Sequence, residues 1–109
     1  MKIKTNELIG AQLDWAVAKC EHSTIHVAHF NDLRSLHVLH REFYYSTNWS
    51  QGGPIIERER FVVEPWGLGW VASVSRGILH HGPTPLIAAM RCYVASKMGD
   101  EVEAPEELT

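Results

Sequence analysis

The sequence predicts an α+β fold, a single layered domain in which a small antiparallel sheet packs with two or three helices. Residues 82–99 read as a nearly apolar helix with its own start and stop signals. Residues 61–75 alternate as the two strands of a hairpin do. A chain of 109 residues is long enough for one domain with a modest core, so we expect a single domain over 1–109.

The N-terminal part predicts a short strand over 2–5 and a helix over 8–20 that Thr5 or Asn6 opens. The apolar stripe of this helix repeats with the helical period: Ile9, Leu13, Ala16, Val17 and Cys20. Trp15 falls outside the stripe, so it either contacts another element or lies exposed. We expect it to be buried within the fold.

The segment that follows is rich in histidine. Residues 23–30 alternate as a strand does, and residues 31–41 predict either a short helical segment or a compact loop. It holds two HxxH pairs, His26 with His29 and His37 with His40. Four imidazoles suit zinc, but structural zinc sites usually include cysteines, and an i, i+3 pair points to opposite faces of a strand. We therefore expect surface or half-buried histidines and predict no metal and no cofactor.

The segment 44–63 fits a strand or a helix. As a strand, both of its faces would mix apolar with charged residues. As a helix, it gathers its apolar residues on one side and begins at Asn48, with Gln51 completing a pattern like a capping box. We predict a helix that ends near Arg60, although Pro54 forfeits a hydrogen bond if the helix runs through it.

The last third of the chain predicts a hairpin and a helix. The hairpin strands are 61–64 and 68–75, joined by a turn at 65–67, and residues 77–81 lead into the helix. Thr84 is a good N-cap, Pro85 suits the first helical position, and Gly99 can end the helix.

The two sides of this last helix differ in size. The larger apolar side chains are Leu86, Ile87, Ala89, Met90, Tyr93, Val94 and Met98, and the small ones are Ala88, Cys92, Ala95 and Ser96. Such a helix needs cover on both sides. The helix over 8–20 covers the small residues in the simpler case. In the other case a second copy of the chain does, and the protein is a homodimer.

Charge and composition limit the function classes. The net charge is -3, and five of the 13 acidic residues lie within 100–109, which we expect to be an acidic, mobile tail. The chain has no cluster of Lys and Arg, so we expect no nucleic-acid partner. No apolar run has membrane length, and no hydrophobic block follows the two lysines near the N-terminus, so we expect no leader. The two cysteines form no CxxC pair. We expect a cytoplasmic protein with no membrane partner and no disulfide.

Four segments, spread in order along most of the chain, carry a family resemblance. They are LDWAVAKC (13–20), YSTNWSQGGPIIERE (45–59), WVA (70–72) and GPTPLIAAMRCYVASK (82–97). This set resembles the NinX family of small phage and prophage proteins, and the part from Tyr45 onward is loosely similar to phage α-β-α sandwich domains. Residues 22–41 depart from the pattern. The resemblance implies a mobile-element origin; because the family carries no established activity, it implies no catalytic residues.

The residues themselves predict no catalytic site, and we lean against an enzyme. Cys92 has His80 and His81 as potential neighbours, but a nucleophilic cysteine needs a lowered pKa and partial exposure, and a packed cysteine is expected. Acidic and basic residues alternate over 57–60, which is typical of a solvated face. The short run 52–54 ends in proline and lacks the amides of a phosphate loop.

Two function classes remain. The cluster over 44–51 interleaves Tyr45 and Trp49 with hydrogen-bonding groups such as Gln51, as recognition surfaces do, although it also fits a capping turn in which Trp49 anchors the helix to the sheet. The first hypothesis is a non-enzymatic accessory protein that binds a host or phage protein. The alternative is a small-ligand or nucleotide binder, or a small enzyme, with a pocket beside Trp49, Trp66 or Trp70.

In that alternative, Arg91 pairs with an anionic ligand, because it is the lone arginine on an otherwise apolar helix. Its structural interpretation is that the side chain snorkels at the edge of the apolar stripe or pairs with a carboxylate. Both interpretations stay open at the level of the sequence.

Overall fold

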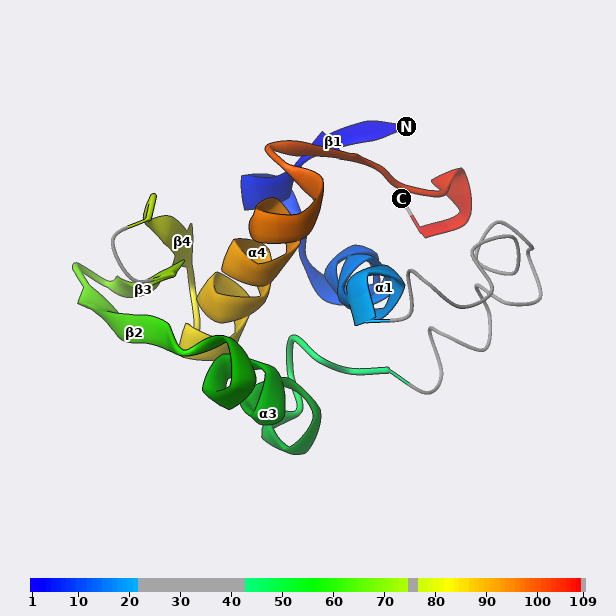
Figure 1. Cartoon of the computed structure of the whole chain (residues 1–109). Helices are drawn as coiled ribbons and strands as arrows, with labels where there is room; N and C mark the ends of the chain where they lie inside the picture. Colours follow the sequence, from blue (N-terminus) through cyan, green and yellow to red (C-terminus); the bar gives the residue numbers. More distant parts are fainter. Residues whose placement is uncertain (22–42, 75–76, 109) are drawn as a thin grey trace.

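The computed structural model describes residues 1–21, 43–74 and 77–108 (Figure 1). Along the chain, the helices, strands and 3-10 turns (η) are β1 (Lys2–Lys4), η1 (Thr5–Glu7), α1 (Gly10–Glu21), α3 (Trp49–Glu59), β2 (Phe61–Trp66), β3 (Gly69–Val74), β4 (His80–Gly82), α4 (Pro85–Met98), β5 (Glu101–Glu103) and η3 (Glu106–Leu108). The predicted α+β class is confirmed. The strand expected over 23–30, the segment 31–41 and both HxxH pairs lie outside the described residues.

The main sheet is antiparallel, with strands in the order β2-β3-β4. Pro65, Trp70 and Gly82 pair across it, and their face packs on α4. The predicted hairpin is confirmed, but its turn is Gly67–Leu68 instead of 65–67. Gly67 has a φ of +60°, which favours glycine and lets a two-residue turn close the hairpin. Residues 77–81 were expected as a lead into the helix, but residues 80–82 form the third strand.

Helix α4 lies between the main sheet and α1 (Figure 1). Its predicted ends are confirmed. The hydroxyl of Thr84 accepts a hydrogen bond from the Ile87 amide at 3.1 Å, Pro85 begins the helix, and Gly99 ends it with a φ of +88°. Since α4 is covered on both sides, most of its side chains are buried.

Helix α1 begins later than predicted, at Gly10. Thr5 does not cap it, because residues 5–7 form a 3-10 turn and the Thr5 hydroxyl donates to the Gly99 carbonyl at 2.6 Å. Ile9, expected in the buried stripe, precedes the helix and is 51% exposed. Trp15 is 3% exposed, which confirms the expected burial.

Helix α3 confirms the helical interpretation of the middle segment, with Pro54 inside the helix and Arg60 ending it at a φ of +58°. The Asn48 side chain accepts from the Ser50 amide at 2.9 Å. Gln51 does not complete a capping box. Its side-chain oxygen accepts instead from the Tyr44 amide at 2.6 Å, so Gln51 holds the preceding turn against the helix.

The acidic segment 100–109 carries β5 and η3. β5 pairs antiparallel with β1, so the two ends of the described chain meet (Figure 1). The Thr5 amide donates to the Asp100 carbonyl at 2.7 Å, and Val102 and Ala104 are buried. The sequence pattern, dominated by acidic residues, gave no sign of this pairing. Mobility of the segment stays a prediction.

A polar network joins the three helices at one end of the core. The Arg58 guanidinium of α3 binds the Glu21 carboxylate of α1 with two hydrogen bonds, of 3.0 and 2.6 Å. The Tyr93 hydroxyl of α4 bonds the same carboxylate, and the Arg58 guanidinium lies 5.7 Å from the centre of the Tyr93 ring. A two-pronged arginine–carboxylate contact fixes the relative placement of α1 and α3.

Candidate functional site

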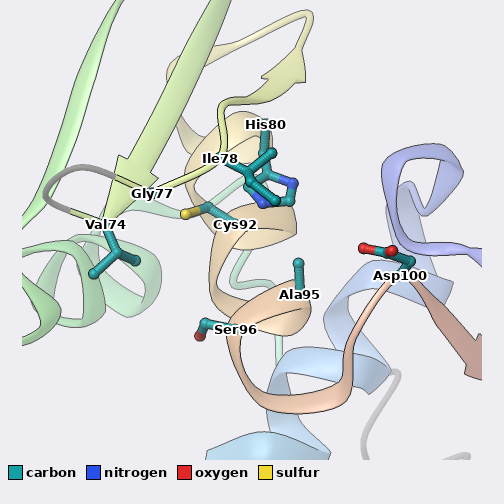
Figure 2. Close-up of a pocket in the computed structure, with 8 residues that line it drawn as sticks. All are labelled: Val74, Gly77, Ile78, His80, Cys92, Ala95, Ser96 and Asp100. Atoms are coloured by element: carbon teal, nitrogen blue, oxygen red, sulfur yellow. The ribbon is translucent and has the colours of Figure 1, made fainter.

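A pocket of about 330 Å³ opens between residues 77–80 and the C-terminal half of α4 (Figure 2). Its lining combines a few polar groups with a larger apolar surface: Val74, Gly77, Ile78, His80, Cys92, Ala95, Ser96 and Asp100. The volume is at the lower end of the range for small-molecule sites. We treat this pocket as the candidate site.

The pocket exists because β4 is close to α4 at one end and apart from it at the other. Gly82 contacts the α4 backbone so closely that a Cβ atom there would lie 2.5 Å from the Ala88 nitrogen. Further along, Ala95 and Ser96 present small side chains on the side of Ile78 and leave the hollow open (Figure 2).

The small-residue face of α4 is therefore divided between packing and the pocket. Ala88 and Cys92 are buried within the chain, and Gly82 of β4 lies directly against Ala88. Ala95 is half-buried and Ser96 is exposed. Half of the surface expected to meet a second copy is thus already covered. A homodimer stays a prediction, and light scattering on the purified protein tests it.

His80 is the imidazole of the pocket. Its Nδ1 lies 3.2 Å from the side-chain oxygen of Asn6, which fixes the ring across from η1. Burial lowers the pKa of His80 below its usual 6.5. The nearby Asp100 carboxylate raises this pKa and His81 lowers it, but burial is the largest of the three effects. His80 is therefore mainly neutral at pH 7 and can both donate and accept a hydrogen bond.

This lowered pKa predicts a pH dependence of stability. As the pH falls through 6.5, the unfolded chain takes up a proton at His80 before the folded chain does, so stability falls, and the loss is complete below the folded pKa. We expect His80→Gln to flatten the stability curve between pH 7 and 5. The check is a set of denaturation midpoints over that range, together with an NMR titration of the His80 ring. A titration midpoint at or above 6.5 contradicts the prediction.

Cys92 is 2% exposed, and burial raises the pKa of its thiol to about 11. At neutral pH the sulfur is therefore protonated, which does not favour a nucleophile. The sulfur points toward the side of Val74, and Asp100 stands on the other side of the pocket (Figure 2). The structure thus places Cys92 and His80 on one pocket without the arrangement of a catalytic pair. Both Cys20 and Cys92 are free.

Asp100 also borders a second hollow, of about 280 Å³, together with Lys4, Thr5, Asn6 and Glu101. The first hollow is largely apolar, whereas this one is lined by charged and polar residues. Asp100 stands between them. The pairing of β1 with β5 brings Lys4, Thr5 and Asn6, which are far from Asp100 in sequence, to this carboxylate.

The predicted recognition turn is only partly exposed. Tyr45 is buried and stacks on Phe43, with ring centres 5.4 Å apart. Gln51 is half-buried and bonds the backbone of the turn, as described above. Trp49 is 55% exposed, so it does not serve as the buried anchor that the alternative interpretation expected. Of these three residues, Trp49 presents the largest free surface.

Trp66 lies at the end of β2 and is also 55% exposed. The register puts Val62, Trp66, Val71 and His81 on the face of the main sheet opposite to α4, which we call the outer face. Trp66 contacts the His81 ring edge-on, with centres 6.1 Å apart. Figure 1 shows α4 and α1 on the other side of this sheet.

Arg91 lies on the α4 side and donates to two backbone carbonyls, those of Leu8 and His81, each at 2.9 Å. It therefore ties α4 to η1 and β4. Trp66 contacts the same strand from the outer face, so β4 separates the two residues. Neither Trp66 nor Arg91 belongs to the described lining of the candidate pocket.

Asn6, Ile78 and Asp100 were missed as site residues. They reach the pocket region through strand pairing and a loop, and no local sequence motif marks them. Within the described ranges, no group of three or more His, Cys, Asp or Glu side chains is placed to hold a metal. None of the helices described is long and apolar enough to cross a membrane.

Fold and site together define a small α+β domain with a central helix, a modest pocket beside that helix and an exposed tryptophan on the outer sheet face. The family model described as Bacteriophage P22, NinX matches residues 4–97. That match covers most of the chain, so the protein belongs to this phage family, and the resemblance is confirmed. The match runs through residues 22–41 as well. Comparison with curated proteins finds no match.

Proposed function

We propose that the protein is a phage or prophage accessory protein that acts in the host cytoplasm by binding a host or phage protein through the outer face. The observation that carries this proposal is the exposed apolar surface there. Trp66 and Val62 are about half exposed, and Leu68 at the hairpin tip is fully exposed. A large aromatic side chain flanked by apolar neighbours is typical of the residues that dominate binding energy in interfaces.

The partner is expected to contact side chains of this face instead of adding a strand to the sheet. Among the strands that the structure describes, β2 is at the edge of the sheet, but Pro65 in it has no amide hydrogen to donate. A proline on an edge strand is a common protection against strand addition. The face also carries Glu64 opposite Val71 and no lysine or arginine on its paired residues, which does not favour a nucleic acid.

Trp49 provides a matched control because it is as exposed as Trp66 but lies on α3. We expect tagged protein to capture a reproducible partner from infected host cells. Trp66→Ala should weaken this binding about tenfold or more, as loss of a central aromatic residue does, while Trp49→Ala retains it. Loss with Trp49→Ala alone would move the interface to the turn over 44–51. Capture that neither variant weakens contradicts the proposal.

A second candidate function is the binding of a small ligand, and the pocket beside α4 favours it. Its place differs from the site that the sequence predicted beside Trp49, Trp66 or Trp70 with Arg91 as the anion partner. A thermal-shift screen with nucleotides and metabolites tests this function, because a ligand that binds only the folded state raises the melting temperature. Ala95→Leu fills part of the pocket and should abolish a shift that arises there, whereas Arg91→Ala tests the predicted site.

A further inference from the structure

The two ends of the pocket differ in chemistry. One end is apolar, formed by Val74, Ile78 and Ala95. At the other end the Asp100 carboxylate is directed toward α4, across the hollow from His80 and Ile78 (Figure 2). Among the lining residues that the structure describes, Asp100 is the one with a formal charge at neutral pH.

The surroundings strengthen this negative end. Asp100 also borders the second hollow, where Glu101 adds a carboxylate and Lys4 a single ammonium. The described lining of the second hollow therefore holds two carboxylates and one ammonium group, a negative balance beside Asp100. A pocket with an apolar body and a negative end is complementary to a ligand with an apolar body and a positive end.

The geometry points to a primary amine on an aliphatic stem as the ligand of this pocket. The ammonium group lies between the Asp100 carboxylate and Nε2 of His80, the nitrogen left to accept because Nδ1 donates to the Asn6 side-chain oxygen. The stem lies along Ile78 and Ala95. This inference rests on the second proposed function, the binding of a small ligand. Two sources carry this chemistry, a free alkylamine and the lysine side chain of a bound protein.

Three compounds with the same stem separate the contributions: n-hexylamine, 1-hexanol and hexanoate. Each is titrated into the full-length protein labelled with ¹⁵N, and the amide shifts of Ala95 and Ser96 report occupancy. The amide of Ile55, buried on α3, serves as the distant reference. We expect n-hexylamine to bind more tightly than 1-hexanol, and hexanoate to bind most weakly, because its charge is repelled by Asp100.

Asp100→Asn is the matched variant. It removes the charge and keeps the Asp100 carbonyl that accepts from the Thr5 amide, so the fold should be retained. We expect the variant to bind n-hexylamine about three- to fivefold more weakly, which is the effect of losing one exposed ion pair. Its affinity for 1-hexanol should be unchanged. Glu101→Gln, the neighbouring carboxylate that borders only the second hollow, should have a smaller effect.

The outcomes separate this inference from the function on which it rests. If 1-hexanol binds at Ala95 and Ser96 as tightly as n-hexylamine, the pocket is a ligand site but the amine inference is wrong. If none of the three compounds shifts these amides, while the thermal-shift screen also fails, both are wrong. Nα-acetyl-lysine amide distinguishes the sources: tighter binding than n-hexylamine indicates a protein side chain, and weaker binding a free amine.

Discussion

Replacing Gly52 with alanine is expected to lower the free energy of unfolding by about 2 kcal/mol, even though alanine is the better helix former. Gly52 is buried where α3 crosses the turn before it and the start of α4. A Cβ atom at this position would lie 2.4 Å from the Tyr45 carbonyl oxygen and 2.7 Å from Cδ1 of Leu86. The leucine can move, but the carbonyl belongs to the backbone, so α3 itself must shift.

Gly53→Ala is the matched control on the same helix. The atom nearest to its added Cβ is a ring carbon of Trp49, at an ordinary contact distance of 3.6 Å. There the gain in helix propensity should dominate and raise stability by about 0.5–1 kcal/mol. Urea denaturation of both variants measures the difference. Equal stability of the two variants would show that the close approach at Gly52 does not constrain the fold.

Helix α4 shows what could be predicted from the sequence. Its start and end depend on residues within one turn of each end, namely Thr84, Pro85 and Gly99, and the contacts that they make are local. The same holds for the start of α3 at Asn48 and for the αL residue Arg60 at its end. Such helix ends can be predicted from the sequence because the groups that form the capping hydrogen bonds lie close together along the chain.

β4 and β5 show what could not be predicted. Each has three residues, too few for an alternating pattern, and each gains its hydrogen bonds from a partner distant in sequence. The pairing of β5 with β1 joins residues about a hundred positions apart, and its strand is flanked by acidic residues that suggested a free tail. Pairing between segments that are distant along the chain produces no periodic pattern in the local sequence from which it could be predicted.

The candidate site follows the same division. His80 and Cys92 were recognised as chemically notable residues, and the structure places both on the pocket. Asp100 was counted only as part of the acidic segment, because its position in the pocket depends on β5. Arg91 was weighed as an anion partner from its isolation on an apolar helix. Its two hydrogen bonds to the Leu8 and His81 carbonyls could not be predicted from a sequence pattern.

Gly82→Ala is expected to cost more than Gly52→Ala, about 3 kcal/mol, because both of the closest atoms belong to the backbone. The new Cβ would lie 2.5 Å from the Ala88 nitrogen and 2.9 Å from its Cα. Neither atom can rotate away. β4 would have to move off α4, which also disturbs the contact of Arg91 with the His81 carbonyl and the position of His80.

A second substitution identifies the cause. Ala88→Gly removes the Ala88 Cβ, which lies 3.2 Å from the new atom, but leaves both backbone contacts in place. If the backbone contacts dominate, Ala88→Gly does not restore the stability of Gly82→Ala, and the double variant is less stable still because glycine weakens the helix. Guanidinium denaturation of the two single variants and the double variant gives the coupling energy. Full rescue would contradict this account, because it would show that a side-chain contact alone separates β4 from α4.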